Sequence, residues 1–377
     1  MSQGAPSIDT HRTPSEEGLP RKVLMLMGYL WGGGAEWHAL NLAWTLRNTL
    51  GVQVDVGYVL AGNADAEQAW RRWDFHPWRV LSPAGLQRVS RGGYDLIHAH
   101  LFKGELVGVL ASIASGTPLV LTRHSLDWWN LPVWQRAVLR RVVHRRTRGI
   151  IAVSSAVADV TRQALAGRLA PVEVVHHGID PQLLGARLRG TDIRQELRLE
   201  GKHLLGSAAR LSRDKGLAFL LEGYARQAAA LADWHIVIAG DGPERGPLER
   251  LTAKLGIADR VHLLGWRDDA LDVVAALDLF VLPSVREGFG LALLEAMTLG
   301  VPAVASGLPS IRETAGDACL YVPPADSHNL GLVLGRLAAD PPLRRDLGAR
   351  GRRRAGEFSA AKMAMRTLEF YRTVVRG

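Results

Sequence analysis

Residues 283–313 have the sequence PSVREGFGLALLEAMTLGVPAVASGLPSIRE, and this stretch decides the fold we expect. From Leu291 to Leu299 it contains no helix breaker and one charge, Glu295, so it predicts a buried helix. Glycine and proline end that helix, and residues 301–305 predict a short buried strand.

The turn Gly288-Phe289-Gly290 immediately precedes the predicted helix. A helix that begins at a glycine turn presents free N–H groups and the positive end of its dipole. Such an end is a ready site for a phosphate group. Glu287 and Glu295 lie eight positions apart, one on each side of the helix start, and we expect them to accept hydrogen bonds from sugar hydroxyls.

The chain has 377 residues, which is too long for one hydrophobic core, so two domains are expected. Its single cysteine, Cys319, excludes a disulfide within the chain and suits a cytoplasmic location. The sequence shows no apolar run of membrane-spanning length and no signal-peptide pattern. Residues 1–20 are polar and predict a flexible N-terminal tail.

The net charge of +9 favours anionic partners. Nucleic acid is one class of anion, but the sequence has no zinc-finger or RNA-recognition motif, so we expect no nucleic-acid partner. A phosphate-bearing small molecule or an anionic membrane surface accounts for the charge equally well.

The first half begins with a predicted strand at 22–27, three glycines that include Gly33 and Gly34, and a predicted helix at 37–50. This order is typical of a nucleotide-binding α/β domain. The loop matches neither the dinucleotide nor the P-loop pattern. A tight turn would need fewer glycines, so we favour close approach of the backbone to a ligand.

Three histidines lie at predicted strand ends. His98 and His100 face the same side and could bind metal, but no third ligand is near them in sequence, so a packing role is favoured. His124 follows the strand at 119–122, and ligands of parallel sheets bind beyond such ends. For His124 the structural and the functional interpretation are equally supported.

Trp128, Trp129 and Trp134 introduce an arginine-rich amphipathic helix that continues to Arg148. Tryptophans beside a basic helix predict contact with an anionic membrane surface, and the alternative is a solvated helix face. We favour a peripheral position on the inner face of the cytoplasmic membrane, because exposed tryptophans are otherwise unfavourable.

The second half again alternates strands and helices, which predicts parallel sheets in both halves. Arg210 and Lys215 lie in and just after a strand-to-helix turn, where a pyrophosphate would bind. We place a first domain at 21–178, joined by the C-terminal helix at 358–377, and a second domain at 179–357.

Five motifs of one known protein family occur along the chain in that family's order. They are Gly-Gly-Ala-Glu at 33–36, Arg-x4-Lys-Gly at 210–216, Gly-Asp-Gly-Pro at 240–243, Leu-Gly-Trp at 264–266 and Glu-x7-Glu at 287–295. With them the chain resembles the retaining glycosyltransferases of family four. That resemblance implies the GT-B fold, in which two Rossmann-like, doubly wound α/β domains face each other across a cleft.

The resemblance also implies roles for individual residues. Arg210 and Lys215 would hold the donor diphosphate, and Glu287 would orient the transferred sugar. The other implied donor-binding residues are Glu295 at the ribose, Gly33 and Gly34 at the phosphates, Gly265, Trp266 and Arg267 at the base, and Gly288, Phe289, Gly290 and Leu291 around the sugar. His124 would lie near the sugar and the acceptor. The pattern departs from the family at Trp31, Trp37, Trp128 and Trp129, so it does not identify the acceptor.

The implied reaction is transfer of a hexose or N-acetylhexosamine, with retention, from a nucleoside-diphosphate sugar to a glycan or lipid-linked acceptor in polysaccharide biosynthesis. UDP is favoured over GDP. Eight helical residues span about 12 Å, more than the roughly 5.5 Å of a covalent retaining carboxylate pair, so front-face transfer is expected. The chain has no Asp-x-Asp motif, so no metal or other cofactor is expected. A sugar phosphorylase, a nucleotide-sugar epimerase and a non-catalytic binding module are the alternatives.

Overall fold

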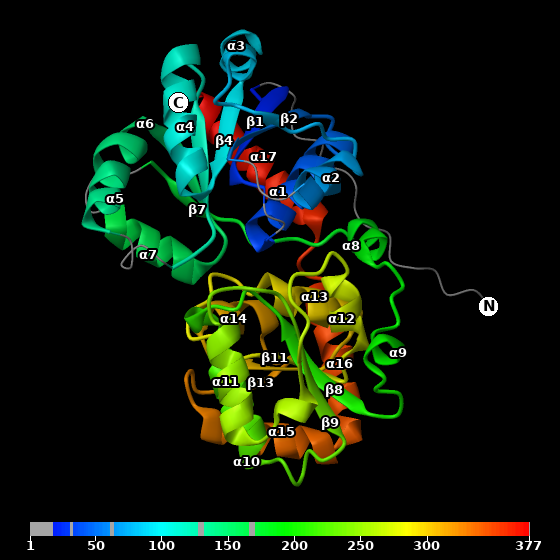
Figure 1. Cartoon of the computed structure of the whole chain (residues 1–377). Helices are drawn as coiled ribbons and strands as arrows, with labels where there is room; N and C mark the ends of the chain where they lie inside the picture. The colour runs from blue at the N-terminus through cyan, green and yellow to red at the C-terminus, as the bar shows by residue number, and fades with distance from the viewer. Residues whose placement is uncertain (1–17, 31–32, 61–63, 127–131, 166–169, 377) are drawn as a thin grey trace, which may run out of the picture.

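The computed structural model describes residues 18–30, 33–60, 64–126, 132–165 and 170–376. These residues form two α/β domains, the first drawn above the second in Figure 1. The first contains a seven-stranded sheet and the second a six-stranded sheet, and all the strand pairs are parallel. The expected pair of parallel sheets is confirmed.

The sheet of the first domain has the strand order β3-β2-β1-β4-β5-β6-β7. Six consecutive residues of β1 are buried, as expected for a strand with helices on both faces. Its strands are β1 (Lys22–Tyr29), β2 (Gln53–Leu60), β3 (Trp78–Arg79), β4 (Leu96–His100), β5 (Leu119–Arg123), β6 (Thr147–Ala152) and β7 (Val172–Val174).

Helices follow most strands of this domain and cover its sheet (Figure 1). They are α1 (Gly34–Asn48), α2 (Ala64–Arg71), α3 (Pro83–Arg91), α4 (Leu101–Ser115), α5 (Val133–Val138), η2 (Leu139–Val143), α6 (His144–Arg146) and α7 (Ser155–Leu165). The predicted arginine-rich helix is therefore interrupted by η2, a π-helical turn.

The sheet of the second domain has the order β10-β9-β8-β11-β12-β13. Its strands are β8 (His203–Ala208), β9 (Trp234–Ala239), β10 (Val261–Leu263), β11 (Leu279–Leu282), β12 (Ala303–Ser306) and β13 (Leu320–Val322). The accompanying helices are α8 (Pro181–Arg187), α9 (Ile193–Leu197), η3 (Arg213–Lys215), α10 (Leu217–Arg226), α11 (Arg245–Leu255), η4 (Ala258–Arg260), α12 (Ala270–Ala276), α13 (Leu291–Leu299), α14 (Pro309–Ala315), α15 (Ser327–Ala339) and α16 (Pro341–Ala355).

The chain crosses between the domains twice, and the two crossings lie side by side. The Ile179 N–H donates to the Phe358 carbonyl at 2.9 Å, and the Ala360 N–H donates to the Ile179 carbonyl at 3.2 Å. Gly178 permits this approach, because a Cβ there would lie 2.4 Å from the Ser359 carbonyl oxygen. The crossings therefore form one hydrogen-bonded connection.

The C-terminal helix α17 (Ala360–Arg376) returns to the first domain, where it packs beside α1 (Figure 1). Its apolar side joins the core that β1 and α1 build, through residues such as Leu368 and Phe370. Tyr371 is fully buried, and its hydroxyl lies 2.5 Å from Nδ1 of His98 on β4. The last helix of the chain thus completes the first domain.

Two strands, β3 and β13, were absent from the expectations drawn from sequence. They have two and three residues and lie at sheet edges, so they carry little periodic signal. The bounds of α13 agree with the predicted helix. Within the described ranges, every helix is too short or too polar to span a lipid bilayer.

We predict that Tyr371→Phe lowers the free energy of unfolding by about 1–3 kcal/mol, because Nδ1 of His98 would stay buried without its partner. Urea titration followed by circular dichroism measures the change. Met365→Ala is the matched control, since Met365 lies on the same helix but is 49% exposed, and its effect should stay within about 0.5 kcal/mol. Equal stability of Tyr371→Phe and the wild type would contradict the anchoring role.

Candidate functional site

The glycine turn, residues 288–290, lies where the two domains meet. Gly290 is the N-cap of α13 and has φ of 88°, a conformation that strongly favours glycine. Phe289 is buried in the core between the domains, 2% exposed, and fixes the turn from beneath. The N-terminus of α13 therefore begins at the domain boundary, with Leu291 as its first residue.

Three contacts join the turn and the start of α13 to the first domain. A Cβ at Gly288 would lie 2.0 Å from the His124 carbonyl oxygen, so only glycine fits without movement. The hydroxyl of buried Ser154 donates to the Gly288 carbonyl at 2.6 Å. Gly34 faces Leu291, since a Cβ there would lie 3.7 Å from Cδ2 of Leu291. Gly33 is the N-cap of α1, so the N-terminus of α1 lies near that of α13.

Lys215 and Glu287 form an ion pair in which Nζ lies 2.7 Å from Oε2. Gly216 makes the pair possible, because it has φ of 65° and a Cβ there would lie 2.0 Å from the Pro283 carbonyl oxygen. The turn that carries Lys215 thus packs directly against the loop that carries Glu287. Arg210 is exposed, and within the described ranges its side chain has no ion-pair partner.

Glu295 is buried, 8% exposed, and forms an ion pair with Arg187 of α8. The guanidinium of Arg187 also lies 4.0 Å from the ring centroid of Trp37 on α1. A cation that touches both a carboxylate and an aromatic face is well held. Arg187 thus connects α8, α13 and α1, a role that its sequence context gave no reason to expect.

The turn after β10 carries Arg267, which is held by ion pairs, and Trp266, which is partly exposed. Arg267 is bound by Glu196 at 2.5 Å and by Asp269 at 2.7 Å. Its hydrogen bond lowers the pKa of Asp269 to about 2 and also lowers the pKa of Glu196. Trp266 is 49% exposed. Gly265 pairs with Gly240 through an N–H···O bond of 2.7 Å, which positions this turn.

A second set of contacts closes the domain boundary beside the glycine turn. Glu313 on α14 accepts hydrogen bonds from the N–H and the hydroxyl of Ser155, and Nε2 of His176 lies 2.5 Å from its Oε1. Burial alone would raise the pKa of Glu313, but the bonds from His176 and Ser155 outweigh burial and lower it. The carboxylate therefore binds the N-terminus of α7 in its charged form.

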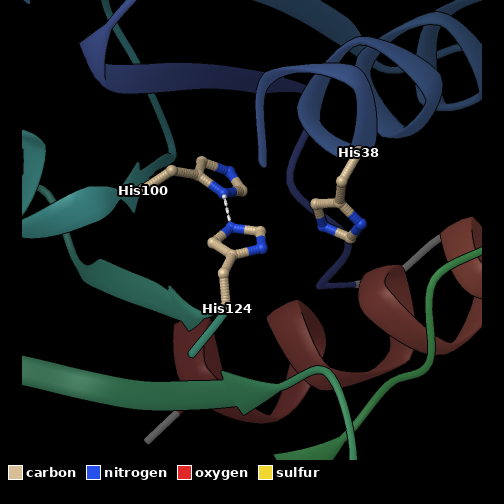
Figure 2. Close-up of side chains that lie close together, drawn as sticks. All are labelled: His38, His100 and His124. Carbon is tan, nitrogen blue, oxygen red and sulfur yellow. Dashed lines mark hydrogen bonds between the residues drawn. The ribbon is translucent and has the colours of Figure 1, made fainter. Parts of the chain in front are cut away.

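Five histidines meet at the carboxyl end of the first sheet, and we call them the histidine cluster. They are His38, His98, His100, His124 and His177. Nδ1 of His100 lies 3.0 Å from Nε2 of His124, and Nδ1 of His38 lies 2.6 Å from Nδ1 of His177. Figure 2 shows the rings of His38, His100 and His124 turned toward one another.

Burial lowers the pKa of every member of the histidine cluster, to about 3 for His38 and His98. The rings are therefore neutral at physiological pH. Nε2 of His38, Nε2 of His100 and Nδ1 of His124 are buried without a hydrogen-bond partner. Unpaired buried nitrogens are rare in folded proteins, and an ordered water, an ion or a catalytic role accounts for them.

Sequence reasoning identified His124 but did not connect it with His38 or His177. His38 lies on α1 just after the glycine loop, and His177 lies in the first crossing segment. The packing role expected for His98 is consistent with its bonds to Tyr371 and Thr122. His100 differs, because histidines distant in sequence surround it. Trp31, Trp128 and Trp129 lie outside the described residues.

Two family models match the chain. The model of glycosyl transferases group 1 matches residues 189–354, and the model of glycosyltransferase family 4 matches residues 32–183. The MMP alpha-(1->4)-mannosyltransferase of Mycolicibacterium hassiacum is 32% identical over 78% of this chain and 74% of its own length. The 2-deoxystreptamine glucosyltransferase of Streptomyces kanamyceticus is 29% identical over 74% of this chain and 78% of its own.

Solved structures resemble the whole fold. The Anabaena protein Alr3699/HepE, in complex with UDP and glucose, superimposes with a TM-score of 0.81 at 24% identity, over 93% of this chain and 99% of that one. Sucrose-phosphate synthase from Thermosynechococcus elongatus gives a TM-score of 0.76 at 21% identity, over 94% and 100%. At these identities the likeness establishes the arrangement of two facing domains.

We predict that Gly288→Ala lowers the thermal unfolding midpoint and increases the radius of gyration, because the added methyl group forces the turn away from the His124 carbonyl. Calorimetry and small-angle X-ray scattering measure the two effects. Gly246→Ala is the control, since its Cβ would meet only the flexible end of Arg250 at 3.4 Å. A Gly288→Ala protein with the wild-type midpoint and radius would disprove the tight contact.

Proposed function

The chain belongs to family 4 of the glycosyltransferases, and on this premise we propose that it transfers a hexose or N-acetylhexosamine from a UDP-sugar to a glycan or lipid-linked acceptor. The observation that carries the proposal is the Lys215–Glu287 pair beside the glycine turn, opposite Gly34 and His124. The solved structures of the Anabaena relative contain UDP, glucose and UDP-glucose, which supports the choice of donor.

Charge develops on the β-phosphate as the sugar leaves. Lys215, Arg210 and the N–H groups that follow Gly290 stabilise that charge in this proposal. Arg210 has no competing carboxylate within the described ranges, so it is ready to bind a phosphate oxygen. One preorganised donor of this kind contributes about 3–4 kcal/mol to the transition state. The leaving group therefore needs no divalent metal ion.

In this proposal Glu287 binds the sugar in addition to forming its ion pair with Lys215. One of its oxygens is bound to Nζ of Lys215, and the carboxylate accepts further hydrogen bonds from sugar hydroxyls. Glu295 takes the ribose while Arg187 holds its carboxylate in place. Trp266, half exposed beside the turn at Gly265, stacks on the base. The donor then lies along the start of α13.

We assign the reaction to front-face transfer with retention of configuration. The acceptor hydroxyl attacks from the side of the leaving phosphate, which takes the proton, and Glu287 forms no covalent bond to the sugar. The backbone carbonyl of His124 lies against the glycine turn, and we propose that its neutral ring binds a hydroxyl of the sugar or the acceptor.

We also propose a peripheral position on the cytoplasmic face of an anionic membrane, and exposed side chains of the first domain support it. Exposed apolar side chains on α4 and α5 are Leu110, Ile113, Val133 and Trp134, with exposed fractions between 59% and 73%. Arg141 and Arg145 are exposed in the segment that α4 packs against. Exposed apolar side chains and exposed arginines on neighbouring elements suit the interface of an anionic bilayer.

We predict that Lys215→Ala and Glu287→Ala each lower the rate of UDP release from a UDP-sugar by at least about 100-fold, because each removes a preorganised contact with the donor. A coupled assay for UDP measures this, with a panel of UDP-sugars and GDP-sugars. Lys202→Ala is the control, since Lys202 forms an exposed pair with Asp233 in the same domain. Wild-type turnover in both site variants would exclude the proposed donor site.

For the membrane surface, we predict that the double variant Arg141→Ser/Arg145→Ser binds phosphatidylglycerol vesicles about 30-fold more weakly, at about 1 kcal/mol per arginine. Vesicle sedimentation measures the change. The control is Arg345→Ser/Arg353→Ser, which removes the same charge from exposed positions of α16 in the second domain. Equal losses in the two double variants would show attraction by net charge alone.

A further inference from the structure

The proposed reaction uses His124 but assigns no role to the neighbouring His38 and His100. His38 is 3% exposed and His100 is fully buried. They come from α1 and β4, while His124 follows β5, so three separate segments deliver one imidazole each to the same point (Figure 2). One ring nitrogen from each of the three lies within 4.8 Å of the other two.

We propose that His38, His100 and His124 bind one divalent transition-metal ion, with zinc as the natural occupant. Neutral imidazole suits zinc, nickel, cobalt and copper, whereas magnesium and calcium require oxygen ligands. Zinc–nitrogen bonds of about 2.0–2.1 Å place tetrahedral ligands roughly 3.4 Å apart. The nitrogens must therefore close in by little more than about 1 Å, which small ring rotations achieve.

The surrounding hydrogen bonds favour this arrangement. Nδ1 of His38 is engaged by His177 at 2.6 Å, which fixes the ring and leaves Nε2 for the ion. Nδ1 of His100 and Nε2 of His124 already face each other at 3.0 Å, close to the spacing of two ligands of one ion, so an ion would replace the hydrogen bond between them. The ion would also supply the partner that Nε2 of His38 lacks. Three protein ligands leave a fourth position for water or a substrate oxygen.

A bound ion would inhibit the transfer reaction. This part of the inference rests on the proposed function. Its ligand His124 is the histidine assigned to the sugar and the acceptor, and the backbone carbonyl of this residue lies against Gly288. Coordination removes the nitrogen that would meet a hydroxyl and holds the ring in place. Zinc is then an inhibitor, while chelation leaves a competent enzyme.

Cobalt(II) titration of the full-length, chelator-treated protein tests the site itself. We expect one ion per chain with the intense visible absorption of tetrahedral cobalt, displaced by zinc. His38→Asn and His100→Asn should each weaken binding by at least about 100-fold, more than loss of an outer hydrogen-bond partner causes. The control is His235→Asn, which removes one member of the His235–His262 pair in the second domain and should bind as the wild type does.

Absence of tetrahedral cobalt absorption in the wild type overturns the proposal, whether or not any variant folds. Equal affinity in the wild type and both cluster variants also overturns it. The inhibition is tested separately, by UDP release with zinc, with magnesium and with chelator alone. Inhibition by zinc alone, reversed by chelator, supports the inhibitory role, and zinc binding with unchanged turnover refutes it. An enzyme with no turnover under any condition counts against the proposed function, while the cobalt result still decides the site.

Discussion

The contact between Gly288 and the His124 carbonyl is the constraint on which the site depends. Because a glycine has no side chain, the turn before α13 approaches the first domain closely enough for Ser154 to bind its carbonyl. That approach places the N-terminus of α13 opposite α1 and beside the histidine cluster. Lys215, Glu287 and Arg187 then surround the same helix end, each held by a partner that the fold supplies.

Charge is distributed unevenly over this boundary. The second domain contributes the ion pairs Lys215–Glu287 and Arg187–Glu295, whereas the first contributes imidazoles that burial keeps neutral. In the proposed reaction a phosphate therefore meets cations on one side, and a hydroxyl meets neutral donors and acceptors on the other. The division matches a donor that carries two phosphates and an acceptor that offers an alcohol, and it explains how one boundary serves both in the proposed reaction.

The sequence predicted the parallel sheets and the bounds of α13, because buried strands and an uninterrupted apolar helix carry strong local signals. It also singled out Lys215 and Glu287 as candidate site residues, although not that they bind each other. The contacts of Arg187, Trp37 and His38 could not be predicted from sequence, since each has its partner more than 80 positions away. Such contacts depend on how the two domains pack together, which the local hydrophobic periodicity of the sequence does not indicate.

The side-by-side crossings have a consequence for how the protein is made. The first domain is incomplete until α17 docks on it, yet α17 is synthesised after the whole of the second domain. The second domain lies wholly between the two crossings, so its core is complete while the core of the first still lacks Tyr371 and Leu368. Folding during synthesis therefore completes the second domain before the first. A product truncated before α17 would retain a complete second domain joined to an incomplete first one.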